Sequence, residues 1–233
     1  MPTTRKVESR LTRLVRRLRT HYGPPVAPPV RDPYLLLLWE QVAYLAEDTK
    51  RRAAYRLLEE SVGTKPTEIL DASDSALRAV TRCGSAIAVS TRADRLRTVA
   101  RRVQDVCGGS LRSAVRLPFA EARRELAKYP SIGEPGAERI LLLSGAHAVL
   151  GLDSNALRVL QRLGYGREYP QWAKTYRDVQ SAAAAELPLT VAARRSAYLL
   201  LRQHGQEICR RSAPRCLQCP LRPDCPTGRG RSA

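Results

Sequence analysis

The sequence predicts an all-α protein. Apolar residues recur at helical spacing between glycine and proline breakers, and no stretch alternates with the two-residue period of a half-buried strand. The 233 residues are 43% hydrophobic and 27% charged, which is an ordinary globular composition. This length is sufficient for a buried core in one large or two small domains.

The first half of the chain divides into helices at its breaker residues. The expected helices cover residues 5–20, 33–46, 48–62, 73–83 and 91–107, with a turn near Thr67. Thr91 with Asp94 resembles a capping pair that opens the last of them. The prolines of residues 24–29 form a stiff connector after the first helix, which suggests a crossing between two lobes.

Two helices joined by a tight turn occupy the centre of the chain. The first begins near Glu121, and the run Pro130-Ser131-Ile132-Gly133 ends it. Pro135 suits the first turn of the next helix, which continues to about residue 146. Such a helix-hairpin-helix leaves backbone N–H groups unpaired at the second helix's N-terminus, where they can hold a phosphate.

An aspartate opens another helix about ten residues later. Leu157, Leu160 and Leu163 share one side of this helix, and Asp153 directly precedes it. Aspartate is among the best N-cap residues, so the residues alone predict a cap. Two further helices are expected over residues 170–186 and 191–204, with Gly205 ending the second.

A cysteine-rich segment follows. Its spacing is Cys-x6-Cys-x2-Cys-x5-Cys, formed by Cys209, Cys216, Cys219 and Cys225. Four cysteines within 17 residues, with no secretory signal, predict a metal site rather than a disulfide framework. The spacing alone leaves both zinc and an iron–sulfur cluster open. Because arginines lie between these cysteines, a metal here would order a loop that presents cations to phosphates.

The charge balance favours a polyanionic partner. Lys and Arg number 40 against 22 Asp and Glu, a formal net charge of +18, which makes nucleic acid the first candidate. An anionic membrane surface also suits this charge, but no apolar run approaches the ~20 residues needed to span a bilayer. Residues 1–20 are arginine-rich, which predicts no signal peptide. They leave open a mitochondrial presequence or the docking face of a domain helix.

Several of these motifs resemble one family. The segments Tyr129–Gly133, Gly136–Ala137 and Leu152–Asp153, with Leu157–Leu160, are similar to the signature of the helix-hairpin-helix DNA glycosylases, the endonuclease III superfamily. The cysteine spacing matches the [4Fe–4S] loop of that family without insertion or deletion. The resemblance covers residues 33–225.

This resemblance implies a two-lobed architecture. A six-helix barrel lobe would cover residues 33–145, with the helix-hairpin-helix at about 121–146. An iron–sulfur cluster lobe would combine residues 1–32 and 146–233. The hairpin and Asp153 are expected to face a cleft between the lobes.

The resemblance also implies a base-excision repair enzyme. It would hydrolyse the N-glycosidic bond of a damaged or modified base that is flipped out of double-stranded DNA. Asp153 would be catalytic, the four cysteines would bind a [4Fe–4S] cluster, with zinc as the alternative, and the DNA contacts would be Gln41, Ser131, Ile132, Gly133 and Gly136. Gln41 would help fill the gap left by the extruded base, although a polar residue on a helix needs no such role. We expect a cytoplasmic, nucleoid-associated monomer.

The sequence also departs from the family pattern. Bifunctional members carry a lysine two residues after the second hairpin glycine, and Pro135 stands there, which predicts monofunctional chemistry. Ser131 replaces the first hairpin glycine, and Glu134 introduces a negative charge that should weaken phosphate binding. Two alternatives stay open. One is a non-catalytic DNA-binding iron–sulfur protein in which Asp153 is only a cap, and the other is weak abasic-site lyase activity through another amine.

Overall fold

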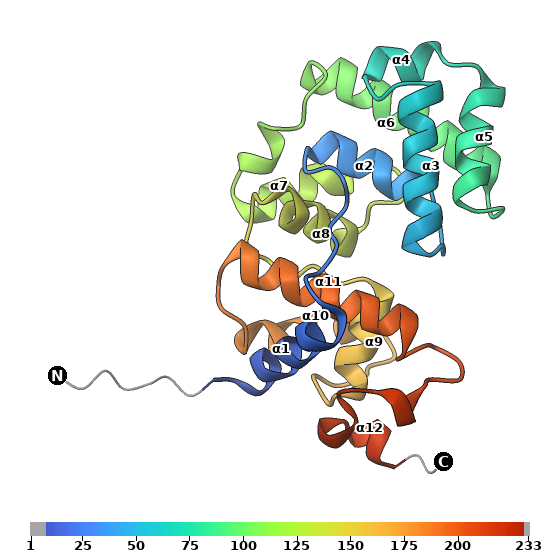
Figure 1. Cartoon of the computed structure of the whole chain (residues 1–233). Helices are drawn as coiled ribbons and strands as arrows, with labels where there is room; N and C mark the ends of the chain where they lie inside the picture. Colours follow the sequence, from blue (N-terminus) through green and yellow to red (C-terminus); the bar gives the residue numbers. More distant parts are fainter. Residues whose placement is uncertain (1–7, 231–233) are drawn as a thin grey trace. The chain divides into compact units, whose positions relative to one another are not determined.

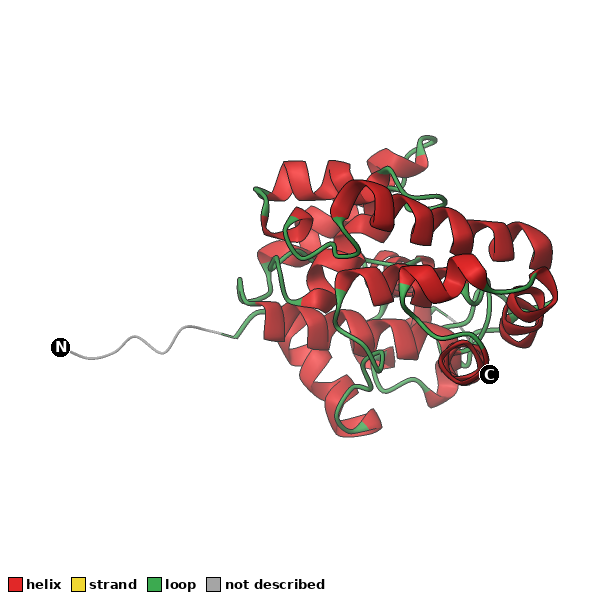
Figure 2. Cartoon of the chain, turned by 90° about the horizontal axis from the view of Figure 1, so that it is seen from above, coloured by secondary structure: helices red, strands yellow, loops and turns green. Residues whose placement is uncertain are grey.

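The regular structure of the described part of the chain is entirely helical. The computed structural model describes residues 8–230, and within them there are twelve α-helices, three short 3-10 helices and no strand (Figures 1 and 2). The all-α prediction is therefore confirmed. The chain divides into two compact units, one formed by Pro28–His147 and the other by residues up to Ala27 together with those from Ala148 on.

The continuous unit is built around α2. Its helices are α2 (Pro33–Gln41), α3 (Asp48–Ser61), α4 (Pro66–Asp71), α5 (Asp74–Gly84), α6 (Val89–Cys107), α7 (Phe119–Ala127) and α8 (Glu134–Ser144), with a 3-10 helix at Ala114–Arg116. Asp32 caps α2, and Pro33 occupies its first turn. Most of the side chains of α2 are buried, and the helix packs against α3, α6 and α8.

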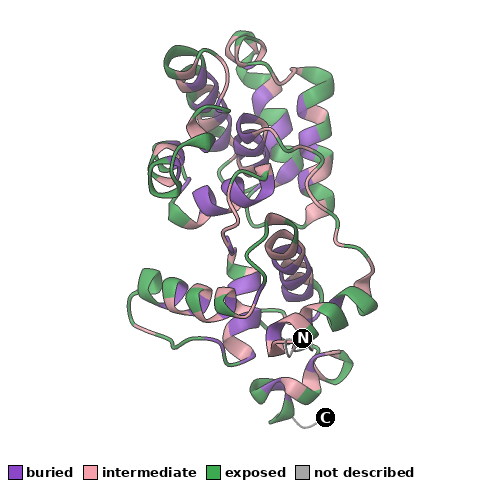
Figure 3. Ribbon diagram, turned by 90° about the vertical axis from the view of Figure 1, so that its left-hand side faces the viewer, coloured by how far each residue is buried: buried purple, intermediate pink, exposed green. Residues whose placement is uncertain are grey.

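The other unit is built around α9 and α11. Its helices are α1 (Arg10–Tyr22), α9 (Ser154–Arg162), α10 (Trp172–Ala185), α11 (Val191–Glu207) and α12 (Pro226–Arg229), with 3-10 helices at Cys216–Gln218 and Arg222–Asp224. α11 packs against α1 and α9, while α10 and α12 also contact α9. In both units, buried and exposed residues alternate along the helices (Figure 3).

One predicted helix end is wrong because a glycine has a packing role. Gly205 lies inside α11 rather than after it. A Cβ atom there would lie 2.7 Å from the carbonyl oxygen of Asn155, so only glycine lets α11 approach α9 this closely. The glycine therefore marks a helix contact and not a helix end.

Other boundaries differ where the backbone takes a left-handed conformation. α2 ends at Gln41 and not at residue 46, and Leu45 beyond it has a φ of 49°. α6 begins at Val89 after Ala88 at φ 50°, so Thr91 lies inside the helix and does not cap it. The buried guanidinium of Arg92 holds the loop after α2 and the loop before α6, because it donates to the carbonyls of Val42 and Ile87.

Two further differences concern helix starts. A helix, α4, replaces the turn expected near Thr67, and the Glu68 carboxylate accepts a hydrogen bond from the backbone N–H of Lys65 at its start. α1 begins at Arg10 with Ser9 as its N-cap. Residues 5–7, which the sequence places in this helix, lie outside the described residues.

No helix of the described part is both long enough and apolar enough to cross a membrane.

Candidate functional site

The predicted hairpin is present between α7 and α8. α7 ends at Ala127, and Gly133 is the N-cap residue of α8, whose first turn contains Pro135. The buried side chain of Ile132 anchors the turn, and a Cβ atom at Gly136 would lie 3.4 Å from it. Because Pro135 has no N–H, the backbone donors of the first turn of α8 are the amides of Glu134 and Gly136.

Ser131 adopts a conformation that glycine favours. Its φ is 57°, in the left-handed region. An L-residue there costs about 1 kcal/mol or more, because its Cβ crowds the following carbonyl oxygen. Ser131 therefore replaces the family's glycine and keeps the left-handed turn.

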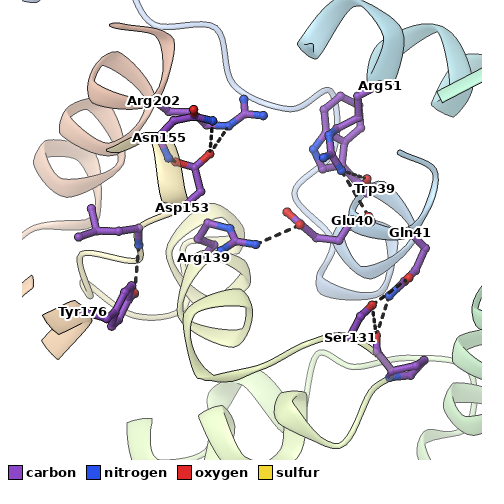
Figure 4. A network of polar contacts seen from close by, with 12 residues as sticks. Trp39, Glu40, Gln41, Arg51, Ser131, Arg139, Asp153, Asn155, Tyr176 and Arg202 are labelled. Atoms are coloured by element: carbon purple, nitrogen blue, oxygen red, sulfur yellow. Dashed lines mark hydrogen bonds and ion pairs between the residues drawn. The ribbon is translucent and has the colours of Figure 1, made fainter. Parts of the chain in front are cut away.

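Gln41 lies beneath this turn and holds it. Its side chain is only 2% exposed, its Nε2 donates to the carbonyl oxygen of Pro130 at 2.8 Å, and its Oε1 accepts from the Ser131 hydroxyl at 3.2 Å (Figure 4). In this arrangement Gln41 supports the hairpin. To enter DNA, as the resemblance implies, the side chain would have to break both hydrogen bonds.

An ion pair joins α2 to α8 through the residue that precedes Gln41. Glu40 of α2 and Arg139 of α8 are 3.1 Å apart, and most of each side chain is buried (Figure 4). At the start of α8, the Glu134 carboxylate lies 3.7 Å from Arg123, which offsets part of its negative charge. Neither pairing could be predicted from the sequence, because the partners come from different helices.

In the other unit, Asp153 caps α9 and is held from two sides. Its Oδ1 accepts hydrogen bonds from the backbone N–H groups of Asn155 at 3.0 Å and Ala156 at 2.8 Å. Its Oδ2 accepts from Arg202 Nε at 2.9 Å and, at 3.5 Å, from Asn155 Nδ2 (Figure 4). The cap expected from the residues is present, and Arg202 on α11 adds an ion pair to a carboxylate that is 18% exposed.

Hydrogen bonds extend from this carboxylate to the cysteine segment. Arg158 Nη2 donates to Asn155 Oδ1 at 2.8 Å and to the Gly205 carbonyl at 2.8 Å. Its Nε donates to the carbonyl oxygen of Cys209 at 2.9 Å. Asp153 and the first cysteine of the segment therefore belong to one polar network.

The four cysteines of the C-terminal segment line a single pocket. Its lining comprises Cys209, Cys216, Cys219 and Cys225 with apolar side chains, Arg162 and His204. All six cysteines are free of disulfides, and Cys83 and Cys107 belong to the other unit. Among the described residues, no three His, Cys, Asp or Glu side chains lie close enough together to hold a single metal ion.

Hydrogen-bond donors surround the sulfur atoms of this pocket. Arg162 Nη1 lies 3.3 Å from Cys209 Sγ, and the backbone N–H of Gly228 lies 3.3 Å from Cys225 Sγ. Burial raises the pKa of the Cys219 thiol to about 11, so a cation is needed to make it a thiolate at neutral pH. The N–H groups of Arg162 and Gly228 would stabilise the negative charge of such thiolates.

Comparison with solved structures identifies the fold. No protein-family model matches the sequence. A trapped covalent complex of endonuclease III with DNA superposes with a TM-score of 0.73 over 92% of this chain and 93% of that chain, at 18% sequence identity. The chain has the endonuclease III fold. The fold expected from the motifs is therefore confirmed.

Two other solved structures share the endonuclease III fold with this chain. A thermostable thymine-DNA glycosylase gives a TM-score of 0.73 at 20% identity, covering 94% of this chain and 96% of that one. A 3-methyladenine DNA glycosylase of H. pylori, bound to 1,N6-ethenoadenine, gives 0.59 at 18% identity, covering 83% and 93%.

Proposed function

We propose that the chain is a monofunctional DNA glycosylase of base-excision repair, acting on a damaged or modified base in double-stranded DNA. The observation that carries this proposal is the Asp153 carboxylate, held by the α9 N-terminus and Arg202 and still partly exposed. The glycosylases among the solved structures of this fold and the formal net charge of +18 support it.

Asp153 would act on the glycosidic bond of a flipped-out nucleotide. That bond breaks through an oxocarbenium-like state, so a fixed carboxylate stabilises the developing positive charge or orients the attacking water. Of the hydrogen bonds to Asp153, the 3.5 Å contact of Oδ2 with Asn155 is the weakest. Oδ2 is therefore the oxygen that can accept a new partner at the smallest cost.

The hairpin would bind the DNA backbone without supplying a nucleophile. The turn of Ser131, Ile132 and Gly133 and the backbone amide of Gly136 would contact a phosphate, with Gln41 holding the turn. A lyase reaction through a Schiff base needs an amine, and Pro135 offers none. The lysine nearest to the turn is Lys128, whose ammonium group pairs with Glu125 at 2.6 Å.

The four cysteines would hold a [4Fe–4S] cluster. They line one pocket, and the sulfur atoms of Cys209 and Cys225 accept hydrogen bonds from the Arg162 side chain and the Gly228 backbone, which suits bound thiolates. The cluster would supply a covalent core that orders the loop between Cys209 and Cys225. Visible absorbance with iron and sulfide analysis distinguishes the cluster from zinc.

The test is base release from duplexes carrying alkylated, oxidised, deaminated and mismatched bases. Wild type and Asp153→Asn are compared, with and without alkali, because asparagine keeps the N-cap while removing the charge. We expect wild type to release a base and to leave strands that break only in alkali, and the variant to lose this activity.

A second candidate function is a DNA-binding protein without catalysis. It is favoured by one observation, that both oxygens of Asp153 already have protein partners. Equal DNA binding by wild type and Asp153→Asn, with every base of the panel retained, would support it.

A further inference from the structure

A buried histidine lies between the N-terminal helix and the cysteine pocket. His204, on α11, is 1% exposed and lines the pocket. Its Nδ1 lies 2.9 Å from the hydroxyl oxygen of Tyr22 on α1, and its Nε2 lies 3.4 Å from Cys219 Sγ. Both ring nitrogens therefore have a polar partner, and all three residues belong to one unit.

The chemistry of the partners fixes the direction of these hydrogen bonds. A neutral imidazole has one donor and one acceptor nitrogen, and a tyrosine hydroxyl can do either. A metal-bound thiolate can only accept. Once Cys219 is a ligand, Nε2 must carry the hydrogen and donate it to the sulfur, which leaves Nδ1 to accept from Tyr22.

We infer that Tyr22 and His204 raise the reduction potential of the cluster proposed above by fixing an N–H···S hydrogen bond to Cys219. Such a bond withdraws electron density from the sulfur and so favours the more reduced state of the cluster. His204 is a positioning residue for the ligand, and Tyr22 holds its tautomer. This inference rests on the proposed cluster and makes α1 part of the cluster's environment.

A histidine with only a packing role would respond differently to substitution. If His204 only filled space, its replacement would change stability but not the spectrum of an intact cluster. A glutamine can place an N–H near the position of Nε2, whereas a leucine of similar size cannot. The pair His204→Gln and His204→Leu therefore separates hydrogen bonding from packing.

The first step of the test is iron, sulfide and visible absorbance of the purified full chain. A colourless wild-type protein without sulfide would overturn the proposed cluster, and the inference with it. With a full cluster, the readouts are the midpoint potential by voltammetry and the Fe–S(Cys) stretching frequency by resonance Raman spectroscopy.

We expect His204→Leu to have a more negative potential and a higher Fe–S stretching frequency than wild type, and His204→Gln to lie between them. Tyr22→Phe should shift both readouts in the same direction by less. Tyr169→Phe, a tyrosine of the same unit whose ring lies 4.2 Å from Lys174 Nζ, should shift neither.

Wild-type potentials and frequencies in His204→Leu would overturn the inference while leaving the proposed cluster intact. If that variant fails to retain its cluster, Tyr22→Phe decides the question, because it removes a single oxygen atom. A spectrum and a potential equal to those of wild type in Tyr22→Phe would then overturn the inference.

Discussion

Replacing Gln41 with leucine should loosen the hairpin turn. The change keeps the volume of the side chain and removes its hydrogen bonds to the Pro130 carbonyl and the Ser131 hydroxyl. Two such bonds contribute about 1–3 kcal/mol together, and the Ser131 hydroxyl, 2.7 Å from the Pro130 carbonyl, can still donate to it, which places the cost toward the lower end, about 1–2 kcal/mol. At ~2–4 °C per kcal/mol for a chain of this size, Tm should fall by about 2–8 °C.

The same change should also weaken DNA binding, because the turn would no longer be held in its binding conformation. If about 1 kcal/mol of this support is lost, Kd rises about fivefold. Thermal denaturation followed by circular dichroism measures the stability, fluorescence anisotropy measures the DNA affinity, and hydrogen exchange shows whether the backbone amides of residues 131–134 become less protected.

The matched control is Gln104→Leu, an exposed glutamine of α6 in the same unit. A substitution at such a position changes stability by about 0.5 kcal/mol or less. The reasoning is refuted if Gln41→Leu is no less stable than Gln104→Leu. A loss of base release without any change in stability or hairpin protection would instead indicate that Gln41 acts directly on DNA.

Three other substitutions test separate parts of the account. Pro135→Lys should restore an amine at the hairpin and yield a DNA complex that borohydride traps, whereas wild type should yield none. Arg202→Leu should leave Asp153 poorly oriented and reduce single-turnover base release about 10²-fold, with DNA affinity retained. A normal rate in this variant would contradict the orienting role. Gly205→Ala should destabilise the protein by about 1–3 kcal/mol in urea unfolding, because its Cβ would meet the backbone of Asn155. Gly230→Ala, with no neighbouring atom closer than 3.9 Å, should not.

The parts of the fold that depend on local signals could be predicted from the sequence. Proline and glycine fix the ends of α7 and the start of α8, and Asp153 caps α9 as its residue type suggests. The cysteine spacing is local too. These features need no knowledge of distant contacts.

The features that could not be predicted depend on residues far apart in the chain. Arg202 lies 49 positions from Asp153, and Tyr22 lies 182 positions from His204. In sequence, a glycine that permits close helix packing, such as Gly205, looks the same as one that ends a helix. Only the packing of α11 against α9 separates the two cases.

The most direct test of the central claim is the single-turnover rate of base release by Asp153→Asn on the substrate that wild type processes. The account predicts a loss of about 10²-fold or more, with the Kd for the same duplex unchanged, because asparagine keeps the cap of α9 and removes only the charge. A rate equal to that of wild type would contradict the catalytic role of Asp153.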